Sequence, residues 1–476
     1  MTINYSKTKI LATLGPATDT CEKLEALVDA GCDAFRLNFS HGSDEYFEKV
    51  FDRINQLCVS KSLPIPILID LQGPKIRIGE LSQPEIEICT GDKIEISNKD
   101  VIGTKEKIST SYKNLPKDAQ IGETILIDDG LINLQVTSKS ASSVICKVIA
   151  GGTLKPKKGM NLPGMKLSTP SVTERDLANL EFALKHRVDF IALSFVREAK
   201  DIFHLKSWLA ERGFNKPIIA KIEKPEAIKN FEEILEISDG IMVARGDLGV
   251  ELAPQEVPLI QKKIIRRCNA VGKLVITATQ MLESMIHNPI PTRAEASDIA
   301  NAVLDGTDVV MLSGETSVGK FPVEAVKIMN EILLTTEVES SQKNISDFEI
   351  PEDLTDNIFD STGRAVANVS EQIKASAIVI FTHYGRKAKV VAKFRPRANF
   401  FAISDKFETL NKLNLEWGIQ PLYLDNIKDE DAAIRNTINL LKEKKFIKEN
   451  DLILFTAGAP YTDKGRRSWM RFAIIQ

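Results

Sequence analysis

Residues 218–247 decide the fold of this chain. They read IIAKIEKPEAI, then a stretch of helical character, and then SDGIMVARGD. The apolar run that ends at Ile222 and the later run GIMVA predict two short buried strands, and residues 225–236 between them predict a helix. A strand–helix–strand order of this kind is typical of a parallel α/β fold.

Three charged residues stand at the ends of these two strands. Side chains alternate along a strand, so Lys221 and Glu223 point the same way, and Asp247 follows the second strand directly. Active sites of α/β barrels lie at the C-terminal ends of their strands. These residues therefore predict a metal site with a neighbouring ammonium, although surface ion pairs at strand ends would give the same pattern.

The bulk composition excludes several classes of protein. The chain has 476 residues, which predicts two to four domains, and its formal charge of −3 argues against a nucleic-acid-binding protein. It contains no apolar run of membrane-spanning length, and its N-terminus lacks a signal-peptide core. The cysteines have neither disulfide-framework nor zinc-site spacing; they are Cys21, Cys32, Cys58, Cys89, Cys146 and Cys268. We expect a reduced cytoplasmic protein that binds neither nucleic acid nor a membrane.

Eight buried strands recur along the first two thirds of the chain. They are expected at 9–14, 34–38, 67–71, 190–193, 218–222, 241–244, 274–277 and 309–312. Helical periodicity fills most of the gaps, as at 21–29, 43–59 and 258–270, and a final helix is expected at 322–334. Eight strand–helix units predict a TIM (β/α)8 barrel, divided here into residues 1–73 and 167–340.

The third and fourth strands are separated by more than a hundred residues of different character. Alternating segments such as KIEIS and SVICKVIA, punctuated by glycine, predict a small antiparallel β-barrel inserted at 74–166. An insertion at this loop lies over the catalytic face, and we call it the lid. After a polar linker at 337–347, residues 345–476 alternate helix and strand again and predict a separate α/β domain with an open sheet.

Polar residues gather at the predicted strand ends of the barrel. Each taken alone has a bland explanation, such as a turn, a helix cap or an ion pair. Together they predict one site; they are Arg36, Asn38, Ser40, Asp70, Lys221, Glu223, Asp247 and Thr279.

The chain closely resembles pyruvate kinases along its whole length. The resemblance rests on RLNFSHG, DLQGPKIR, KKGMNLPG, AKIEKPEAI, VARGDLGVEL, TATQMLESM, PTRAEASDIANAV and MLSGET. It implies transfer of the phosphoryl group of phosphoenolpyruvate to ADP, giving pyruvate and ATP in the last step of glycolysis. It also implies a homotetramer and a C-terminal regulatory domain that binds a phosphorylated effector.

The resemblance assigns roles to the substrate-binding and metal-binding residues. Glu223 and Asp247 would bind Mg²⁺ or Mn²⁺, which agrees with the preference of these ions for oxygen ligands. Lys221 would face the moving phosphoryl group and Arg36 would hold the phosphate. The amides of Gly246 and Asp247, with the Thr279 hydroxyl, would hold the substrate carboxylate at a helix N-terminus, and Thr279 would help to protonate the enolate.

The nucleotide and K⁺ sites follow from the same resemblance. The nucleotide would contact Arg77, Lys158 and the stretch from Asn38 to His41. Family members that need K⁺ bind it at positions matching Asn38, Ser40, Asp70 and Leu71.

Two departures from the family pattern affect function. Leu71 replaces a hydroxyl residue, and Lys75 stands where K⁺-requiring members have Glu; we expect the Lys75 ammonium to substitute for K⁺. In the C-terminal domain the predicted effector loop has Tyr384 and Lys387 in place of small hydroxyl residues, while Thr382, Gly385 and Arg386 keep the pattern. We therefore expect a monophosphate effector rather than a sugar bisphosphate.

Two other functions remain compatible with parts of this pattern. A metal-dependent lyase or aldolase acting on pyruvate enolate would use Glu223 and Asp247, but it would not need the lid, Arg77 or Lys158. A non-enzymatic metabolite sensor would not need Lys221. An assay with phosphoenolpyruvate and ADP separates these readings.

Overall fold

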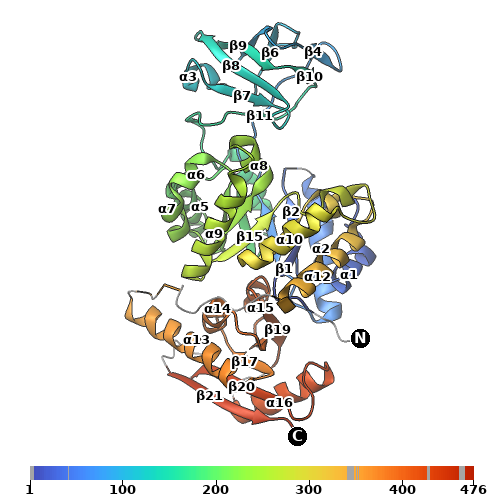
Figure 1. Cartoon of the computed structure of the whole chain (residues 1–476), viewed down its shortest axis with the longest axis vertical. Helices are drawn as coiled ribbons and strands as arrows, with labels where there is room; N and C mark the ends of the chain where they lie inside the picture. The colour runs from blue at the N-terminus through green and yellow to red at the C-terminus, as the bar shows by residue number, and fades with distance from the viewer. Residues whose placement is uncertain are drawn as a thin grey trace.

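The protein is built from three parts that follow one another along its long axis (Figure 1). The computed structural model describes residues 5–40, 42–339, 348–349, 351, 353–425, 429–459 and 467–476. The lid stands at one end, the barrel in the middle and the C-terminal domain at the other end. No helix in these ranges has the length and apolar character needed to cross a membrane.

The middle part is a closed barrel of eight parallel strands in the order β1-β16-β15-β14-β13-β12-β3-β2, which confirms the TIM barrel prediction. The strands are β1 (Lys9–Thr13), β2 (Ala34–Asn38), β3 (Ile67–Asp70), β12 (Phe190–Leu193), β13 (Ile218–Ile222), β14 (Gly240–Ala244), β15 (Leu274–Ala278) and β16 (Val309–Leu312). Their side chains are almost all buried, because barrel strands pack on both faces.

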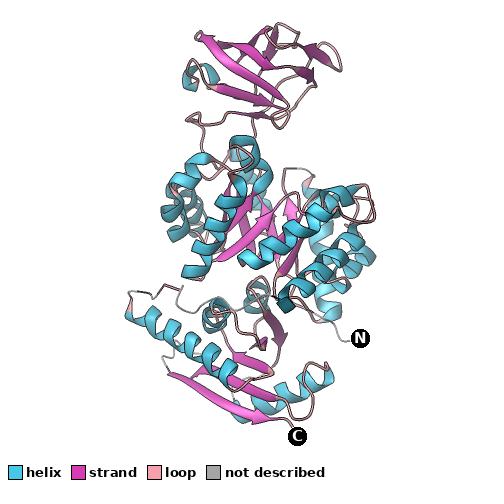
Figure 2. Cartoon of the chain, viewed as in Figure 1, coloured by secondary structure: helices cyan, strands magenta, loops and turns pink. Residues whose placement is uncertain are grey.

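Helices surround the barrel, as Figure 2 shows. They are α1 (Cys21–Asp29), α2 (Asp44–Lys61), α4 (Glu174–Ala183), α5 (Ala199–Glu211), α6 (Pro225–Lys229), α7 (Phe231–Ile237), α8 (Arg245–Glu251), α9 (Val257–Val271), η1 (Glu283–Ile286), α10 (Arg293–Asp305), α11 (Gly314–Ser317) and α12 (Pro322–Glu339). The helix predicted at 225–236 is two helices, because the backbone departs from helical geometry at Asn230 (φ −98°, ψ 20°). Helix α12 continues to Glu339, so the predicted linker begins inside it, and residues 340–347 lie outside the described ranges.

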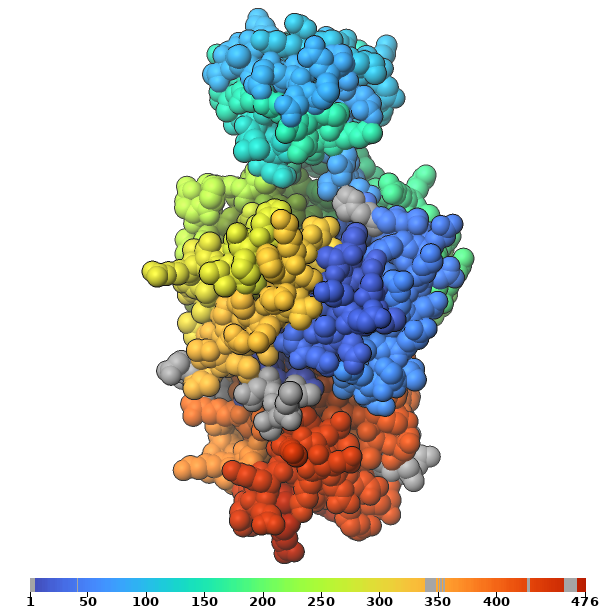
Figure 3. All heavy atoms as spheres, turned by 90° about the vertical axis from the view of Figure 1, so that its right-hand side faces the viewer, coloured from blue at the N-terminus to red at the C-terminus, as the bar shows by residue number. Residues whose placement is uncertain are grey.

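The lid follows β3 and has a hydrophobic core of its own. Its elements are β4 (Ile86–Ile88), β5 (Lys93–Ser97), β6 (Lys107–Ser109), α3 (Leu115–Asp118), β7 (Thr124–Ile127), β8 (Ile132–Lys139), β9 (Ser143–Ala150), β10 (Gly152–Leu154) and β11 (Met160–Asn161). Ladder hydrogen bonds group these strands into a six-stranded and a two-stranded sheet. In the space-filling view the lid meets the barrel over a narrow contact (Figure 3).

The C-terminal domain is a five-stranded sheet in the order β19-β18-β17-β20-β21, in which only β21 is antiparallel to its neighbour. Its elements are α13 (Leu354–Gln372), β17 (Ala377–Phe381), α14 (Arg386–Lys393), β18 (Asn399–Ser404), α15 (Phe407–Leu413), β19 (Ile419–Tyr423), α16 (Glu430–Glu443), β20 (Leu452–Ala459) and β21 (Arg467–Ile474). The open α/β sheet matches the prediction, while the exact domain boundaries stay predictions.

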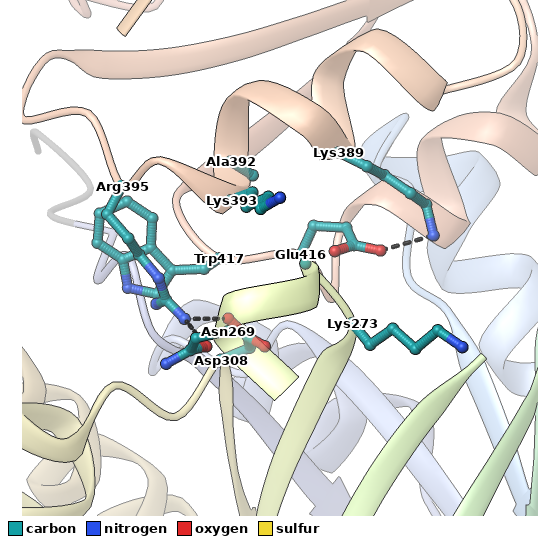
Figure 4. Close-up of a pocket in the computed structure, with 10 residues that line it drawn as sticks. Asn269, Lys273, Asp308, Lys389, Ala392, Lys393, Arg395, Glu416 and Trp417 are labelled. Atoms are coloured by element: carbon teal, nitrogen blue, oxygen red, sulfur yellow. Dashed lines mark hydrogen bonds and ion pairs between the residues drawn. The ribbon is translucent and has the colours of Figure 1, made fainter. Parts of the chain in front are cut away.

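Arg395 joins this domain to the underside of the barrel (Figure 4). Its guanidinium donates to the side chain of Asn269 at 2.9 Å and pairs with Asp308 at 2.5 Å. The Arg395 guanidinium and the Lys7 ammonium both lie over the indole of Trp417, 4.7 and 5.3 Å from the ring centroid. Buried charged contacts of this kind need good geometry to be stable, and here Asn269 also donates to Gly306 O and Asp308 also accepts from the Val275 amide.

Candidate active site

Lys221 is the centre of the polar cluster at the C-terminal mouth of the barrel. Its ammonium, on a side chain that is 11% exposed, donates to Ser194 Oγ at 2.7 Å and pairs with Glu223 at 2.8 Å and Asp70 at 3.3 Å. Burial acts to lower the pKa of Lys221, but the carboxylates of Asp70, Glu223 and Asp247 raise it above its usual value. The group is therefore a permanent cation held in a fixed position.

Arg36 on β2 forms the second cation of the cluster. Its Nε and Nη2 both contact Asp70 Oδ2, at 2.8 and 2.7 Å, and its Nη1 donates to Thr13 Oγ1 at 2.9 Å. Burial would raise the pKa of Asp70, but Lys221 and Arg36 outweigh it and lower that pKa. One buried carboxylate thus holds both cations side by side.

Glu223 and Asp247 provide the carboxylates expected at a metal site. Glu223 is buried and accepts from the Phe195 amide at 2.9 Å, whereas Asp247 is exposed in the first turn of α8. Burial raises the pKa of Glu223; Lys221 opposes this rise and the negative charge of Asp247 adds to it. A divalent cation would relieve the repulsion between these two carboxylates, so this edge of the cluster suits a metal ion.

The described residues hold no group of three or more His, Cys, Asp and Glu side chains able to bind a metal ion by themselves. A cation at Glu223 and Asp247 would therefore complete its shell with substrate oxygens or water, as Mg²⁺ commonly does.

Thr279 lies against the first turn of α8, which begins where the sequence predicted a helix. Its hydroxyl donates to Ala278 O at 2.7 Å and accepts from the Gly246 amide at 2.7 Å. A Cβ on Gly246 would lie 3.3 Å from that hydroxyl oxygen, so the close approach favours glycine here. The structure brings Gly246 and Thr279 together through this hydrogen bond, and Asp247 follows Gly246 in the first turn of α8.

The residues predicted for a K⁺ site do not all face the cluster. Asn38 accepts from the Ser40 amide at 3.1 Å, and both oxygens of Asp70 already contact cationic groups. The Leu71 side chain is buried in the core between strands and helices. Lys75 is exposed; partial desolvation and the charge of Arg77 lower its pKa, while Asp247 and Asp129 act to raise it.

The residues predicted for the nucleotide lie on the lid and at the barrel mouth. Arg77 pairs in an isolated bridge with Gly159, and its Nη1 donates to Lys157 O at 2.9 Å. Lys158 forms an ion pair with Asp128 at 2.9 Å. Both cations thus have protein partners on the lid, and His41 lies outside the described residues.

Two residues of the cluster, Ser194 and Phe195, follow β12 and were not among the residues predicted from the sequence. Ser194 Oγ accepts from Lys221 and lies 3.4 Å from Asp70 Oδ1, so it links two members of the cluster. Phe195 has a positive φ of 56°, and its amide orients Glu223. The available signal was their place just beyond an apolar strand, the same place that singled out the other site residues.

Comparisons with known proteins agree with this geometry. The family model "Pyruvate kinase, barrel domain" matches residues 5–326, and "Pyruvate kinase, alpha/beta domain" matches residues 360–472. Proteins named pyruvate kinase from Geobacillus stearothermophilus and Staphylococcus aureus (strain MRSA252) are 43% and 42% identical over 98% of this chain and 80% of their own length. A crystal structure of a pyruvate kinase from Cryptosporidium parvum is similar with a TM-score of 0.91 at 36% identity, over 99% of this chain and 96% of that one.

Proposed function

Since this chain belongs to the pyruvate kinase family and transfers the phosphoryl group of phosphoenolpyruvate to ADP in the last step of glycolysis, we propose that Lys221 is its principal catalytic cation. Phosphoryl transfer depends on positioning and on neutralising the charge of the transferred group. The observation that supports this role is the Lys221 ammonium itself, held by oxygens of Ser194, Asp70 and Glu223.

Arg36 would bind the phosphate of the substrate next to Lys221. Its Nε and Nη2 converge on the same oxygen of Asp70, and this anchors the guanidinium plane at the barrel mouth. A planar guanidinium suits bidentate recognition of phosphate better than an ammonium does.

Glu223 and Asp247 would hold the divalent cation that the family generally requires, as Mg²⁺ or Mn²⁺. When bound, this ion would neutralise charge on the oxygens of the substrates. The repulsion between the two carboxylates supports the assignment.

Gly246, Asp247 and Thr279 would bind the carboxylate of phosphoenolpyruvate, and Thr279 would also serve the protonation of the enolate. The contact between the Gly246 amide and the Thr279 hydroxyl supports a shared site. Binding of a carboxylate there would replace the amide contact with a charge-assisted hydrogen bond, the stronger of the two.

The nucleotide would lie between barrel and lid, at Asn38, His41, Arg77 and Lys158. In the described structure Lys158 pairs with Asp128 and Arg77 with a backbone carbonyl. The phosphates of the nucleotide would bind Arg77 and Lys158 in place of these partners. Nucleotide binding would then be coupled to the position of the lid.

Catalysis would not require K⁺, because the Lys75 ammonium would supply the monovalent charge. Lys75 is within electrostatic reach of Lys221 and Asp247, and among the described residues its ammonium forms no ion pair. The carboxylate of Asp70 already pairs with Arg36 and Lys221, so its charge is largely neutralised and it would bind a monovalent ion less strongly.

A phosphorylated effector, a homotetrameric assembly and a cytoplasmic location complete the proposal. At the effector loop Arg386 pairs with Asp356, and the Lys387 ammonium donates to Ala457 O at 3.0 Å. Arg386 and Lys387 therefore have internal partners, and this supports a weak response to a sugar bisphosphate.

The test is the Mg²⁺ dependence of the rate with phosphoenolpyruvate and ADP. We expect Glu223→Gln and Asp247→Asn each to raise the Mg²⁺ concentration for half-maximal rate by more than about tenfold, since even outer-shell changes commonly cost 10–100-fold in metal affinity. The control is Glu48→Gln, an exposed carboxylate on α2. If neither variant differs from the control, the cation is held elsewhere.

A further inference from the structure

The loop that carries Thr279 has an unfavourable backbone conformation. Thr279 and Gln280 have φ values of 69° and 55°, in the left-handed region that non-glycine residues rarely adopt. For a β-branched residue such as Thr this is a clear outlier. Strained conformations of this kind persist only where surrounding contacts impose them, and they concentrate at functional sites.

The Arg245 side chain supplies those contacts. Its Nη2 donates to Thr279 O at 2.7 Å and to Gln280 O at 3.3 Å, and its Nε donates to Ala278 O at 3.3 Å. Its Nη1 pairs with Asp298 on α10 at 2.5 Å, and only 10% of the side chain is exposed. One guanidinium thus donates hydrogen bonds to three consecutive carbonyl oxygens of the strained loop.

The same residue fixes the other side of the Thr279 hydroxyl. Arg245 begins α8 and directly precedes Gly246, whose amide donates to Thr279 Oγ1. The hydroxyl donates in turn to Ala278 O, one of the carbonyls that Arg245 binds. Further along the loop, buried Glu315 accepts from the Leu282 amide at 3.0 Å. The loop is therefore held by a cation at its carbonyls and by an anion at an amide.

We propose that Arg245 is a positioning residue that sets the direction of the Thr279 hydroxyl for protonation of the enolate. This inference rests on the proposed role of Thr279. The competing explanation is that Arg245 only ties α8 to α10 through Asp298. The two differ in which contacts matter: the carbonyl contacts in the first case, the ion pair in the second.

Four variants separate these explanations. Arg245→Met removes all the contacts, and Arg245→Lys keeps the charge but cannot bridge three carbonyls with one ammonium. Asp298→Asn removes the ion pair and leaves the carbonyl contacts in place. Thr279→Ala removes the hydroxyl itself. All four are prepared as the full chain, and their thermal unfolding is compared.

Two rates are measured for each variant. The first is steady-state turnover of phosphoenolpyruvate and ADP. The second is exchange of the pyruvate methyl protons with D₂O, followed by NMR with ATP and Mg²⁺ present, which reports proton transfer at the enolate carbon. A general loss of structure would raise KM and lower both rates, whereas misdirection of one hydroxyl would act on exchange and kcat with little change in the KM for phosphoenolpyruvate.

We expect exchange and kcat to fall by about 10²-fold in Arg245→Met and at least about tenfold in Arg245→Lys, the scale of a misplaced catalytic group. Asp298→Asn should keep both rates. The proposal is overturned if both Arg245 variants exchange at the unmutated rate, or if Asp298→Asn matches Arg245→Met. Slow exchange in Thr279→Ala with normal exchange in the Arg245 variants would remove only the positioning role. Normal exchange in Thr279→Ala would remove the role of Thr279, and the positioning role with it.

Discussion

Replacing Lys221 with Met tests the role of the cation most directly, because Met keeps the length of the side chain and removes the charge. Loss of a cation that stabilises the transition state of phosphoryl transfer costs about 10³–10⁵ in kcat. At about 1.36 kcal/mol per tenfold change, this corresponds to roughly 4–7 kcal/mol of transition-state stabilisation. We expect a fall in turnover of that size, with phosphoenolpyruvate binding largely retained through Arg36.

The same substitution should also change stability in a way that depends on metal. Removing one partner of a buried ion pair costs about 3–5 kcal/mol, because the other charge is left uncompensated. Asp70 would keep Arg36 at 2.7 Å, whereas Glu223 would keep, among the residues that the structure describes, only the Phe195 amide at 2.9 Å. Because Asp70 stays paired, we expect the free energy of unfolding to fall by the lower end of that range, about 3 kcal/mol. Mg²⁺ bound at Glu223 would restore part of it.

The measurements are coupled-assay turnover and urea unfolding, each with and without Mg²⁺. Lys49→Met on the exposed side of α2 is the matched control. Turnover within about tenfold of the unmutated enzyme, far below the loss expected for such a cation, would show that the Lys221 ammonium does not act on the transferred group. Equal stability of Lys221→Met and the control would show that the ion pair with Glu223 carries no net energy.

The remaining predictions concern K⁺ and the C-terminal domain. With an organic counter-cation in place of Na⁺ and K⁺, the enzyme should turn over fully, and Lys75→Glu should acquire a K⁺ requirement; strong activation of the unmutated enzyme by K⁺ at fixed ionic strength would contradict this. Fructose 1,6-bisphosphate should activate poorly, because the Lys387 ammonium is bonded to Ala457 O and Tyr384 replaces a small hydroxyl residue of the loop; a large shift of the phosphoenolpyruvate saturation curve at low bisphosphate concentration would refute it. Burial lowers the pKa of Lys387 to about 8 from 10.5, so the unfolded chain binds more protons between these values and stability should rise with pH across them. In Lys387→Met this rise, about 2–4 kcal/mol, should disappear, as urea unfolding at pH 7 and pH 10 would reveal.

The barrel could be predicted because its strands are buried on both faces and appear as short continuous apolar runs. Its interruption by the lid could also be predicted, because the strands between the third and fourth barrel strands alternate apolar and polar residues instead of being continuously apolar. The break between α6 and α7 at Asn230 could not, since no proline or glycine marks it and the residues on both sides favour a helix.

For the candidate site, residues that carry charge could be predicted from the sequence, whereas Ser194 and Phe195, which contact them, could not. Lys221, Glu223 and Asp70 were singled out because charged residues at strand ends stand out from apolar runs. Ser194 approaches Lys221 only through the register of β12 and β13, in which Leu193 lies opposite Ala220. The ion pair between Lys158 and Asp128 joins two segments of the lid that lie far apart in the sequence, and local sequence patterns do not predict such a pairing.

The place of the lid in the chain has a consequence for synthesis on the ribosome. Strand β3 ends at Asp70, and its neighbour β12 begins at Phe190, so the first three barrel strands emerge with the edge of β3 unpaired. At about 5–20 residues per second, synthesis of the residues between β3 and β12 takes roughly 6–24 s. An unpaired strand edge that is exposed for this time can pair with a strand of another chain. The lid has its own core and can fold during this time. At Gly73 the chain leaves the barrel, and the Gly73 amide donates to Asp176 Oδ1 at 3.2 Å. Asp176 lies on α4, the first helix after the lid. A folded lid would thus bring β12 back beside β3 over a far shorter effective loop than its residue count suggests, which lowers the entropy cost of closing the barrel.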